Sequence, residues 1–271
     1  MPHVVALYRH PIKGFTPEPL ESMTVQSDGR VAGDRVLAFR FADAATPEER
    51  DGLDHWPKAK GLSLQDFPAL AALRTHYDDK RARVRIEHEG AVLVEAALDE
   101  AGRAELTDAV TAFVLATPEG RRLGRPGRLP LVLVGDGETS RFQDRARGYV
   151  SLHSRGSADA LAEAAGTGID DRRFRSNIVI DGVDAWAELD WQGEVRIGDV
   201  TLRTEGPIVR CLATHANPDT GERDVRVLTT LTNAIGQTEP TLGRLFLPAT
   251  GGIDHASTAG IIRVGDDVHV G

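Results

Sequence analysis

The chain has 271 residues, of which 41% are hydrophobic and 27% charged, a composition typical of globular rather than disordered proteins. Its formal net charge of −9 argues against a general nucleic-acid-binding protein, which would carry a basic domain or stripe. The single cysteine, Cys211, excludes an intramolecular disulfide, a cluster held by several thiolates, and zinc patterns built on cysteine pairs. Because no apolar run suits a signal peptide or a membrane helix, we expect a cytoplasmic protein that binds neither membranes nor nucleic acid.

The first half of the chain predicts few regular elements. Residues 42–61 lack periodicity and are expected to form a surface insertion. Residues 81–98 surround a Glu-His-Glu-Gly turn, which predicts two strands. In residues 99–116, apolar side chains recur at helical spacing from Leu106 to Val114, which predicts an amphipathic helix packed on the core.

The 117–130 segment is rich in glycine, proline and arginine and is the best candidate for a linker. It divides the chain into an N-terminal domain, residues 1–120, and a C-terminal domain, residues 121–271.

Short strands dominate the second half. Residues 157–166 predict a helix capped by Ser157 and ended by Gly166. Residues 176–182 predict a buried strand, and residues 193–205 and 260–271 each predict a hairpin around a Gly-Asp turn. Many short strands with few helices indicate a mainly β protein (α+β) of the barrel or sandwich type.

Several common sites are missing from the sequence. It contains neither a P-loop nor the glycine turn of dinucleotide-binding proteins, and Leu152 replaces the first glycine of a nucleophile elbow around Ser154. No two histidines have the spacing of a helical zinc site.

Cys211 leaves three possibilities open: a buried filler thiol, a nucleophile or a soft metal ligand. The adjacent Arg210 favours its thiolate form. Upstream, residues 170–177 contain three arginines and Asn177, which are either solvated charges or binders of a phosphate or polyanionic ring. The residues alone do not decide between these alternatives.

Ordered segments along nearly the whole chain resemble the MOSC-domain proteins that carry an N-terminal MOSC β-barrel domain, and in particular the amidoxime-reducing members of that family. The segments are HPIKGF (10–15), GDRVLAFR (33–40), FRSNIVIDG (174–182), VRIGDVTLR (195–203), VRC (209–211), NPDTGERD (217–224) and IRVGDDV (262–268). The resemblance implies an N-terminal MOSC β-barrel-like domain packed on a C-terminal MOSC β-barrel domain.

The resemblance also implies a molybdenum-cofactor enzyme. Cys211 would be the catalytic residue and the metal ligand, beside sulfurs of the pterin dithiolene. The residues that would hold the molybdenum cofactor (Mo-molybdopterin) are Lys13, Arg35, Arg175, Asn177, Arg210 and Cys211. The implied activity is an oxidoreductase that reduces small N-hydroxylated or N-oxide substrates by oxygen-atom transfer to molybdenum. Its electrons would come from a separate donor of the reductase or ferredoxin type.

Two alternatives stand beside this one. MOSC relatives include sulfur-handling proteins, in which Cys211 would carry a persulfide, and the fold could also serve a non-catalytic binder. The sequence departs from the family at Gly14, where members usually have serine or threonine, and at His215, where they often have threonine. Residues 246–260 have no clear family counterpart.

Overall fold

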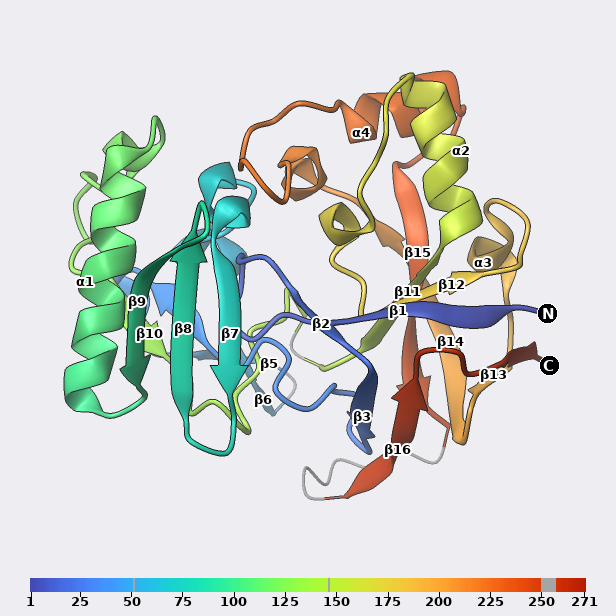
Figure 1. Ribbon diagram of the computed structural model, residues 1–271, viewed down its shortest axis with the longest axis horizontal. Coiled ribbons are helices and arrows are strands. Elements are labelled where there is room, and N and C mark those ends of the chain that lie inside the picture. Colours follow the sequence, from blue (N-terminus) through green and yellow to red (C-terminus); the bar gives the residue numbers. More distant parts are fainter. Residues whose placement is uncertain (51, 146, 250–256) are drawn as a thin grey trace.

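The largest sheet has eight strands in the order β17-β13-β14-β15-β11-β12-β1-β2 and curls into a half-barrel (Figure 1). It belongs to a computed structural model that describes residues 1–50, 52–145, 147–249 and 257–271. The strands are β1 (His3–Arg9), β2 (Glu18–Leu20), β11 (Val150–Ser154), β12 (Ile178–Asp181), β13 (Glu194–Ile197), β14 (Val200–Val209), β15 (Thr241–Pro248) and β17 (Val268–Val270). The protein is therefore mainly β, as the sequence predicts.

The central strands of this sheet form because their side chains are buried. β11 is buried at every position, and Ile178, Val179 and Ile180 of β12 are fully buried on both faces of the sheet. The apolar run of β12 is typical of strands covered on both faces, whereas β11 also buries the polar residues Ser151, His153 and Ser154. The predicted 193–205 hairpin is confirmed as β13 and β14. β14 extends beyond residue 205 and pairs irregularly with β15 between Thr204 and Val209, just before Cys211.

A second region lies on the left of Figure 1. It combines a three-stranded sheet, β7 (Arg74–Asp78), β8 (Arg83–His88) and β9 (Ala91–Ala97), with helix α1 (Glu100–Ala116). Asp99 caps α1 by accepting a hydrogen bond from the Gly102 amide, and Leu106, Val110 and Val114 are buried against the core. The two predicted strands and the predicted helix are confirmed, but β7 is an additional strand.

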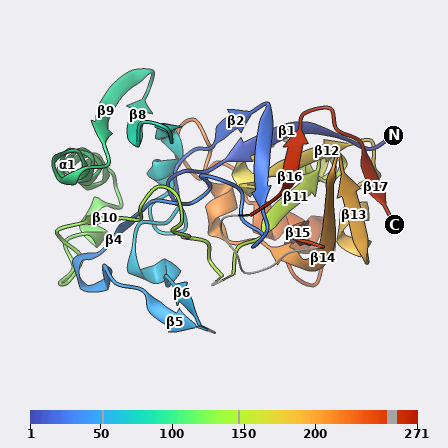
Figure 2. The same ribbon diagram turned by 90° about the horizontal axis from the view of Figure 1, so that it is seen from below.

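Three two-stranded pairs complete the strands. β4 (Ala38–Arg40) pairs with β10 (Val132–Val134), β5 (Glu48–Arg50) with β6 (Leu53–His55), and β3 (Ser22–Gln26) with β16 (Thr258–Arg263). Figure 2 shows the β5–β6 hairpin projecting away from the remaining strands. The division of the chain at residue 120 stays a prediction, although β1, β3 and β4 of the N-terminal part pair with strands of the C-terminal part.

The remaining helices and helical turns are short. They are α2 (Arg155–Ala165), α3 (Ala187–Asp190) and α4 (Val227–Thr229), the π-helical turn η7 (Thr230–Ala234), and the 3₁₀ turns η1 (Ala42–Ala44), η2 (Lys58–Lys60), η3 (Pro68–Ala72), η4 (Gly120–Arg122), η5 (Asp171–Phe174) and η6 (Leu212–His215). α2 ends at Gly166 in a left-handed conformation, as predicted. The predicted cap was wrong, because Ser154 rather than Ser157 caps α2 by accepting from the Ser157 amide.

The predicted hairpin over residues 260–271 is also wrong. A turn does form, since the Asp266 amide donates to the Arg263 carbonyl, but the flanking strands pair with different partners. β16 pairs with β3, and β17 pairs with β13 of the large sheet. Within the 246–260 segment, residues 250–256 lie outside the described residues.

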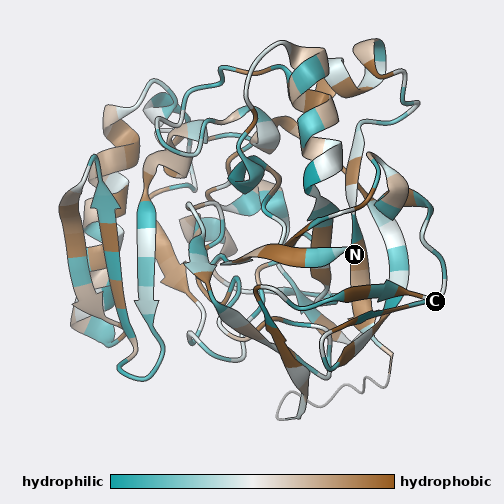
Figure 3. Cartoon of the chain, turned by 45° about the vertical axis from the view of Figure 1, so that its right-hand side comes forward, coloured by the Kyte–Doolittle hydropathy of each residue, from teal (hydrophilic) through white to brown (hydrophobic). Residues whose placement is uncertain are grey.

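Hydropathy follows this arrangement. Figure 3 shows hydrophobic runs along the interior strands, whereas the peripheral loops are largely hydrophilic. Among the described residues, the longest helix is neither long nor apolar enough to cross a bilayer.

Candidate functional site

A cleft of about 290 Å³ lies where the N-terminal segments meet the large sheet. Its lining is strongly cationic, although the whole chain is acidic. Among the described lining residues, one carboxylate, Asp144, faces seven cationic side chains: Lys13, Arg35, Lys58, Arg145, Arg173, Arg175 and Arg210. Such a concentration of positive charge suits a ligand that carries phosphate or other anionic groups.

Cys211 lies at the wall of this cleft, two residues after β14 ends. Its thiol is half-buried and free of any disulfide. The nearest cation is Lys58, whose Nζ donates a hydrogen bond to Sγ at 3.3 Å. Lys58 lies on η2, so the expected surface insertion is only partly correct. The β5–β6 hairpin is largely exposed, but the following segment buries Trp56 and brings Lys58 to the thiol.

Asp144 links two lysines of the cleft. Its Oδ1 lies 2.7 Å from Nζ of Lys13, and its Oδ2 lies 3.1 Å from Nζ of Lys58. Burial alone would raise the pKa of Asp144, but the two ammonium groups outweigh burial and hold that pKa well below its usual range. Burial likewise would lower the pKa of Lys58, but Asp144 and Cys211 together raise it. The group beside the thiol is therefore a charged ammonium.

Arg35 and Arg175 are joined by a hydrogen bond and share an unusual backbone conformation. Both residues adopt left-handed backbone conformations, each with φ of 54°, which is unfavourable for any residue except glycine. The Arg35 guanidinium donates to the Arg175 carbonyl at 2.9 Å, and the Arg175 guanidinium donates to the Phe15 carbonyl at 2.6 Å. Burial and the neighbouring Arg35 lower the pKa of Arg175 to about 9. Strained backbones of this kind concentrate at functional sites.

Two buried residues, Asp34 and His10, hold the Arg35 side chain in place. Asp34 forms an ion pair with Arg35 and accepts a 2.7 Å hydrogen bond from the His10 amide. Burial, followed by Arg175 and Arg35, lowers the pKa of His10 to about 3, so its imidazole is neutral. Burial would raise the pKa of Asp34, but Arg35 and the hydrogen bonds from His10 keep the carboxyl ionised.

Arg210 is directed along the wall rather than toward the thiol. Its Nε donates to the Leu242 carbonyl and one Nη to the Phe174 carbonyl, both at 2.7 Å. Its other terminal nitrogen is buried without a hydrogen-bond partner, and burial lowers the pKa of Arg210 to about 9. A buried cation with an unused donor is costly unless an anion approaches it.

Asn177 is the one predicted site residue that does not line the cleft. It is fully buried, and its side-chain oxygen accepts a 2.8 Å hydrogen bond from the Ser151 hydroxyl. Its amide nitrogen donates to the Tyr8 carbonyl at 3.2 Å. Because Ser151 does line the cleft, Asn177 acts on the site through that neighbour. Its contact with a bound group stays a prediction.

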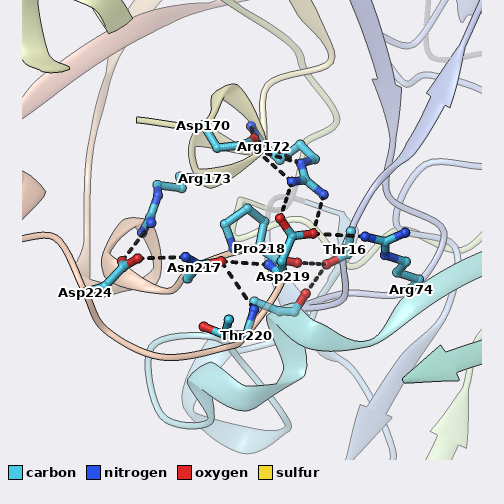
Figure 4. A network of polar contacts seen from close by, with 11 residues as sticks. Thr16, Arg74, Asp170, Arg172, Arg173, Asn217, Pro218, Asp219, Thr220 and Asp224 are labelled. Carbon is cyan, nitrogen blue, oxygen red and sulfur yellow. Dashed lines mark hydrogen bonds and ion pairs between the residues drawn. The ribbon is translucent and has the colours of Figure 1, made fainter. Parts of the chain in front are cut away.

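The arginines before Asn177 are not simply solvated. Arg173 is 5% exposed and donates to the His215 carbonyl at 3.0 Å and to Asp224 at 2.7 Å. Arg172 binds both Asp170 and Asp219 (Figure 4). The His215 ring accepts a 3.2 Å hydrogen bond from the Leu228 amide and is not among the described residues that line the cleft.

Two family models match the chain. The MOSC N-terminal beta barrel domain matches residues 1–120, and the MOSC domain matches residues 139–269. This is a MOSC-domain protein. Its MOSC domain supplies Arg175, Asn177, Arg210 and Cys211, whereas the residues matched by the N-terminal model supply Lys13, Arg35 and Lys58.

The chain spans less than a third of the length of two of its curated relatives. Mitochondrial amidoxime-reducing component 1 of Mus musculus is 38% identical over 99 residues, which is 36% of this chain and 29% of that protein. Molybdenum cofactor sulfurase of Drosophila grimshawi is 48% identical over 59 residues, which is 22% of this chain and 8% of that protein. The YuaD protein of Bacillus subtilis covers 99% of this chain and 94% of its own at 10% identity, but its TM-score of 0.42 is too low to carry an argument. This MOSC-domain protein is thus a distant relative of the first two.

Proposed function

We propose that the cleft binds a molybdenum cofactor with the Cys211 thiolate as the protein's ligand to the metal. The observation that carries the proposal is the lone thiol of the chain in a cleft lined by seven cations. A soft thiolate suits a sulfur-rich transition-metal centre. The residues present fit the group, because Arg210, which lines the cleft, keeps one buried terminal nitrogen without a hydrogen-bond partner among the described residues.

Five of the cations that line the described cleft have a defined part in this proposal. Lys13, Arg35, Arg175 and Arg210 bind the anionic groups of the pterin, for which guanidinium and ammonium donors are suited. Asn177 holds the Ser151 hydroxyl at the cleft and keeps β11 and β12 in register. The ammonium of Lys58 stabilises negative charge on Sγ.

We further propose that the protein reduces N-hydroxylated or N-oxide substrates. The bound molybdenum would supply the two-electron chemistry that takes oxygen from nitrogen. With two protons, the substrate then yields the amine or amidine and water. The mouse relative is named for the reduction of amidoximes. The single cysteine cannot hold an iron–sulfur cluster, so the electrons come from a separate donor protein of the reductase or ferredoxin type.

A sulfur-carrier function is the second candidate. The specific observation that favours it is the Lys58 ammonium 3.3 Å from Sγ, which would equally stabilise the anion of a Cys211 persulfide. The fly relative is named as a molybdenum cofactor sulfurase. In this alternative the persulfide donates its outer sulfur to an acceptor, and the thiolate of Cys211 is regenerated.

Metal and pterin content distinguish the candidates. Wild-type protein and Cys211→Ser would be purified from a host that makes the molybdenum cofactor. The proposal expects about one molybdenum per wild-type chain and a large loss in the variant. Equal molybdenum in both would refute Cys211 as the ligand. Protein without molybdenum, but with cyanide-releasable sulfur that depends on Cys211, would favour the carrier instead.

A further inference from the structure

The loop of residues 217–224, six residues after Cys211, makes contacts that its turn sequence alone does not explain. Asp219 accepts hydrogen bonds from Arg172 at 2.9 and 3.1 Å, and it accepts another from Arg74 at 3.1 Å (Figure 4). Arg172 lies on η5 beside the cleft residues Arg173 and Arg175, whereas Arg74 begins β7 of the N-terminal region. One carboxylate therefore connects the two regions that form the cleft.

Three more contacts join the 217–224 loop to the N-terminal region. The Arg223 guanidinium donates to the Gln65 carbonyl at 2.5 Å, and the Thr16 hydroxyl, whose nearer acceptor is the Ala71 carbonyl, lies 3.2 Å from the Pro218 carbonyl. Gly221 approaches so closely that a Cβ placed on it would lie 2.5 Å from the Cα of Ala69. The loop is thus packed against the N-terminal region by both hydrogen bonds and direct backbone contact.

The contacted residues continue the N-terminal wall of the cleft. Thr16 follows the cleft residues Lys13 and Gly14, and Gln65 follows the cleft residues Ser63 and Leu64. On the other side, Arg173 joins the loop through Asp224 and supports the 212–215 turn after Cys211 through the His215 carbonyl. The loop therefore lies between the segments that carry the two walls.

We propose that the 217–224 loop sets the separation of the cleft walls, with Asp219 and Gly221 as positioning residues. The spacing that it sets is the one that places Lys58 of the N-terminal wall 3.3 Å from the Cys211 thiol. This inference goes beyond the proposed function, because it concerns the geometry of the cleft whatever that cleft binds. Where the ligand is the molybdenum cofactor, the loop also controls its retention.

Cross-linking of Lys58 to Cys211 in cofactor-free protein tests the spacing directly. Cys211 is the chain's one thiol, so a short amine-to-thiol reagent such as succinimidyl iodoacetate reports on a single sulfur. The Lys58–Cys211 product is measured by peptide mass spectrometry, at a temperature at which circular dichroism shows every variant folded. Because small displacements strongly affect reactions between held groups, we expect Gly221→Ala to lower the yield about tenfold.

The chain offers matched controls for Gly221→Ala and Asp219→Asn. Gly90 has φ of 79°, close to the 73° of Gly221, but a Cβ there would meet nothing within 4 Å, so Gly90→Ala adds backbone strain without a collision. Asp170 also pairs with Arg172, and in the described part of the chain its side-chain hydrogen bonds stay within its own turn, so Asp170→Asn controls for Asp219→Asn. Arg74→Gln, at an exposed side chain, tests the same contact with little risk of unfolding.

The inference expects reduced yields in Gly221→Ala, Asp219→Asn and Arg74→Gln, and wild-type yields in both controls. Equal yields in all five variants, or an equal loss in the controls, would overturn it. Molybdenum content of the same variants from a cofactor-competent host is a separate readout. If wild-type protein held no molybdenum while the cross-linking pattern appeared, the proposed function would fail and the wall-spacing role would stand.

Discussion

Arg175 allows a test of whether the site stores backbone strain. Its φ of 54° and ψ of 30° place it in the left-handed helical region immediately after η5. A residue with a Cβ costs about 1–2 kcal/mol in that conformation, whereas glycine adopts it freely. Arg175→Ala and Arg175→Gly both delete the guanidinium and its hydrogen bond to the Phe15 carbonyl. The two variants therefore differ by one methyl group and by the backbone conformations that it restricts.

The magnitude follows from two opposing effects. Relief of the left-handed strain favours glycine by about 1–2 kcal/mol, and the greater freedom of glycine in the unfolded chain disfavours it by about 0.5–1 kcal/mol. We therefore expect Arg175→Gly to be more stable than Arg175→Ala by about 0.5–1 kcal/mol. Arg173 lies inside the preceding turn and has no positive φ, so Arg173→Ala should be more stable than Arg173→Gly.

Urea unfolding followed by circular dichroism measures both pairs, with the slopes checked for equality. If Arg175→Ala proved the more stable variant, the left-handed conformation would not be retained and the strain argument would be wrong. Molybdenum content should be low in both Arg175 variants, since both lack the guanidinium. If Arg175→Gly is the more stable variant but binds little molybdenum, the strained backbone at Arg175 is tolerated because the arginine side chain is needed for function.

Three further outcomes test single contacts. Lys58→Met should lower the molybdenum content of purified protein severalfold, whereas Lys60→Met, at an exposed neighbour, should leave it unchanged; equal contents would contradict a role for the ammonium at Sγ. Because the pKa of Asp144 is depressed in the folded protein, Asp144→Asn should lower the free energy of unfolding at neutral pH. The difference between wild type and variant should shrink and disappear as the pH falls below about 4, which urea unfolding across that range measures. Ser154→Ala should cost about 1–3 kcal/mol in urea unfolding, because it removes a helix cap and a 2.9 Å hydrogen bond to the buried Glu188, and molybdenum per folded chain should not change.

Local patterns predicted the elements whose stabilising contacts are local. Helix α1 follows from the spacing of Leu106, Val110 and Val114. The cap of α2 was misplaced by three residues because Ser154 and Ser157 are both good caps in sequence. Only the fold shows that both hydroxyls donate to Glu188, which fixes Ser154 at the helix start.

Pairings between distant segments were outside the reach of such patterns. The turn at Asp266 was recognised, but its strands join β3 and β13, which lie far away along the chain. Lys58 was missed for the same reason, since 153 residues separate it from Cys211 and nothing periodic surrounds it. A short polar segment that contains Trp56 was the available signal, because a tryptophan in a supposed surface loop usually anchors that loop to the core.

Adjacency in sequence suggested Arg210 as the cation beside the Cys211 thiol, but the structure gives that place to Lys58. Adjacent residues after an extended strand point to opposite sides, so a neighbour in sequence is rarely a neighbour of the reactive atom. Arg210 accordingly binds the Leu242 and Phe174 carbonyls inside the wall, and the contact with Sγ comes from Lys58 across the cleft. The charge beside Cys211 therefore depends on how the two walls are held together, which makes the thiol's surroundings a property of the 217–224 loop as well as of the strand that carries it.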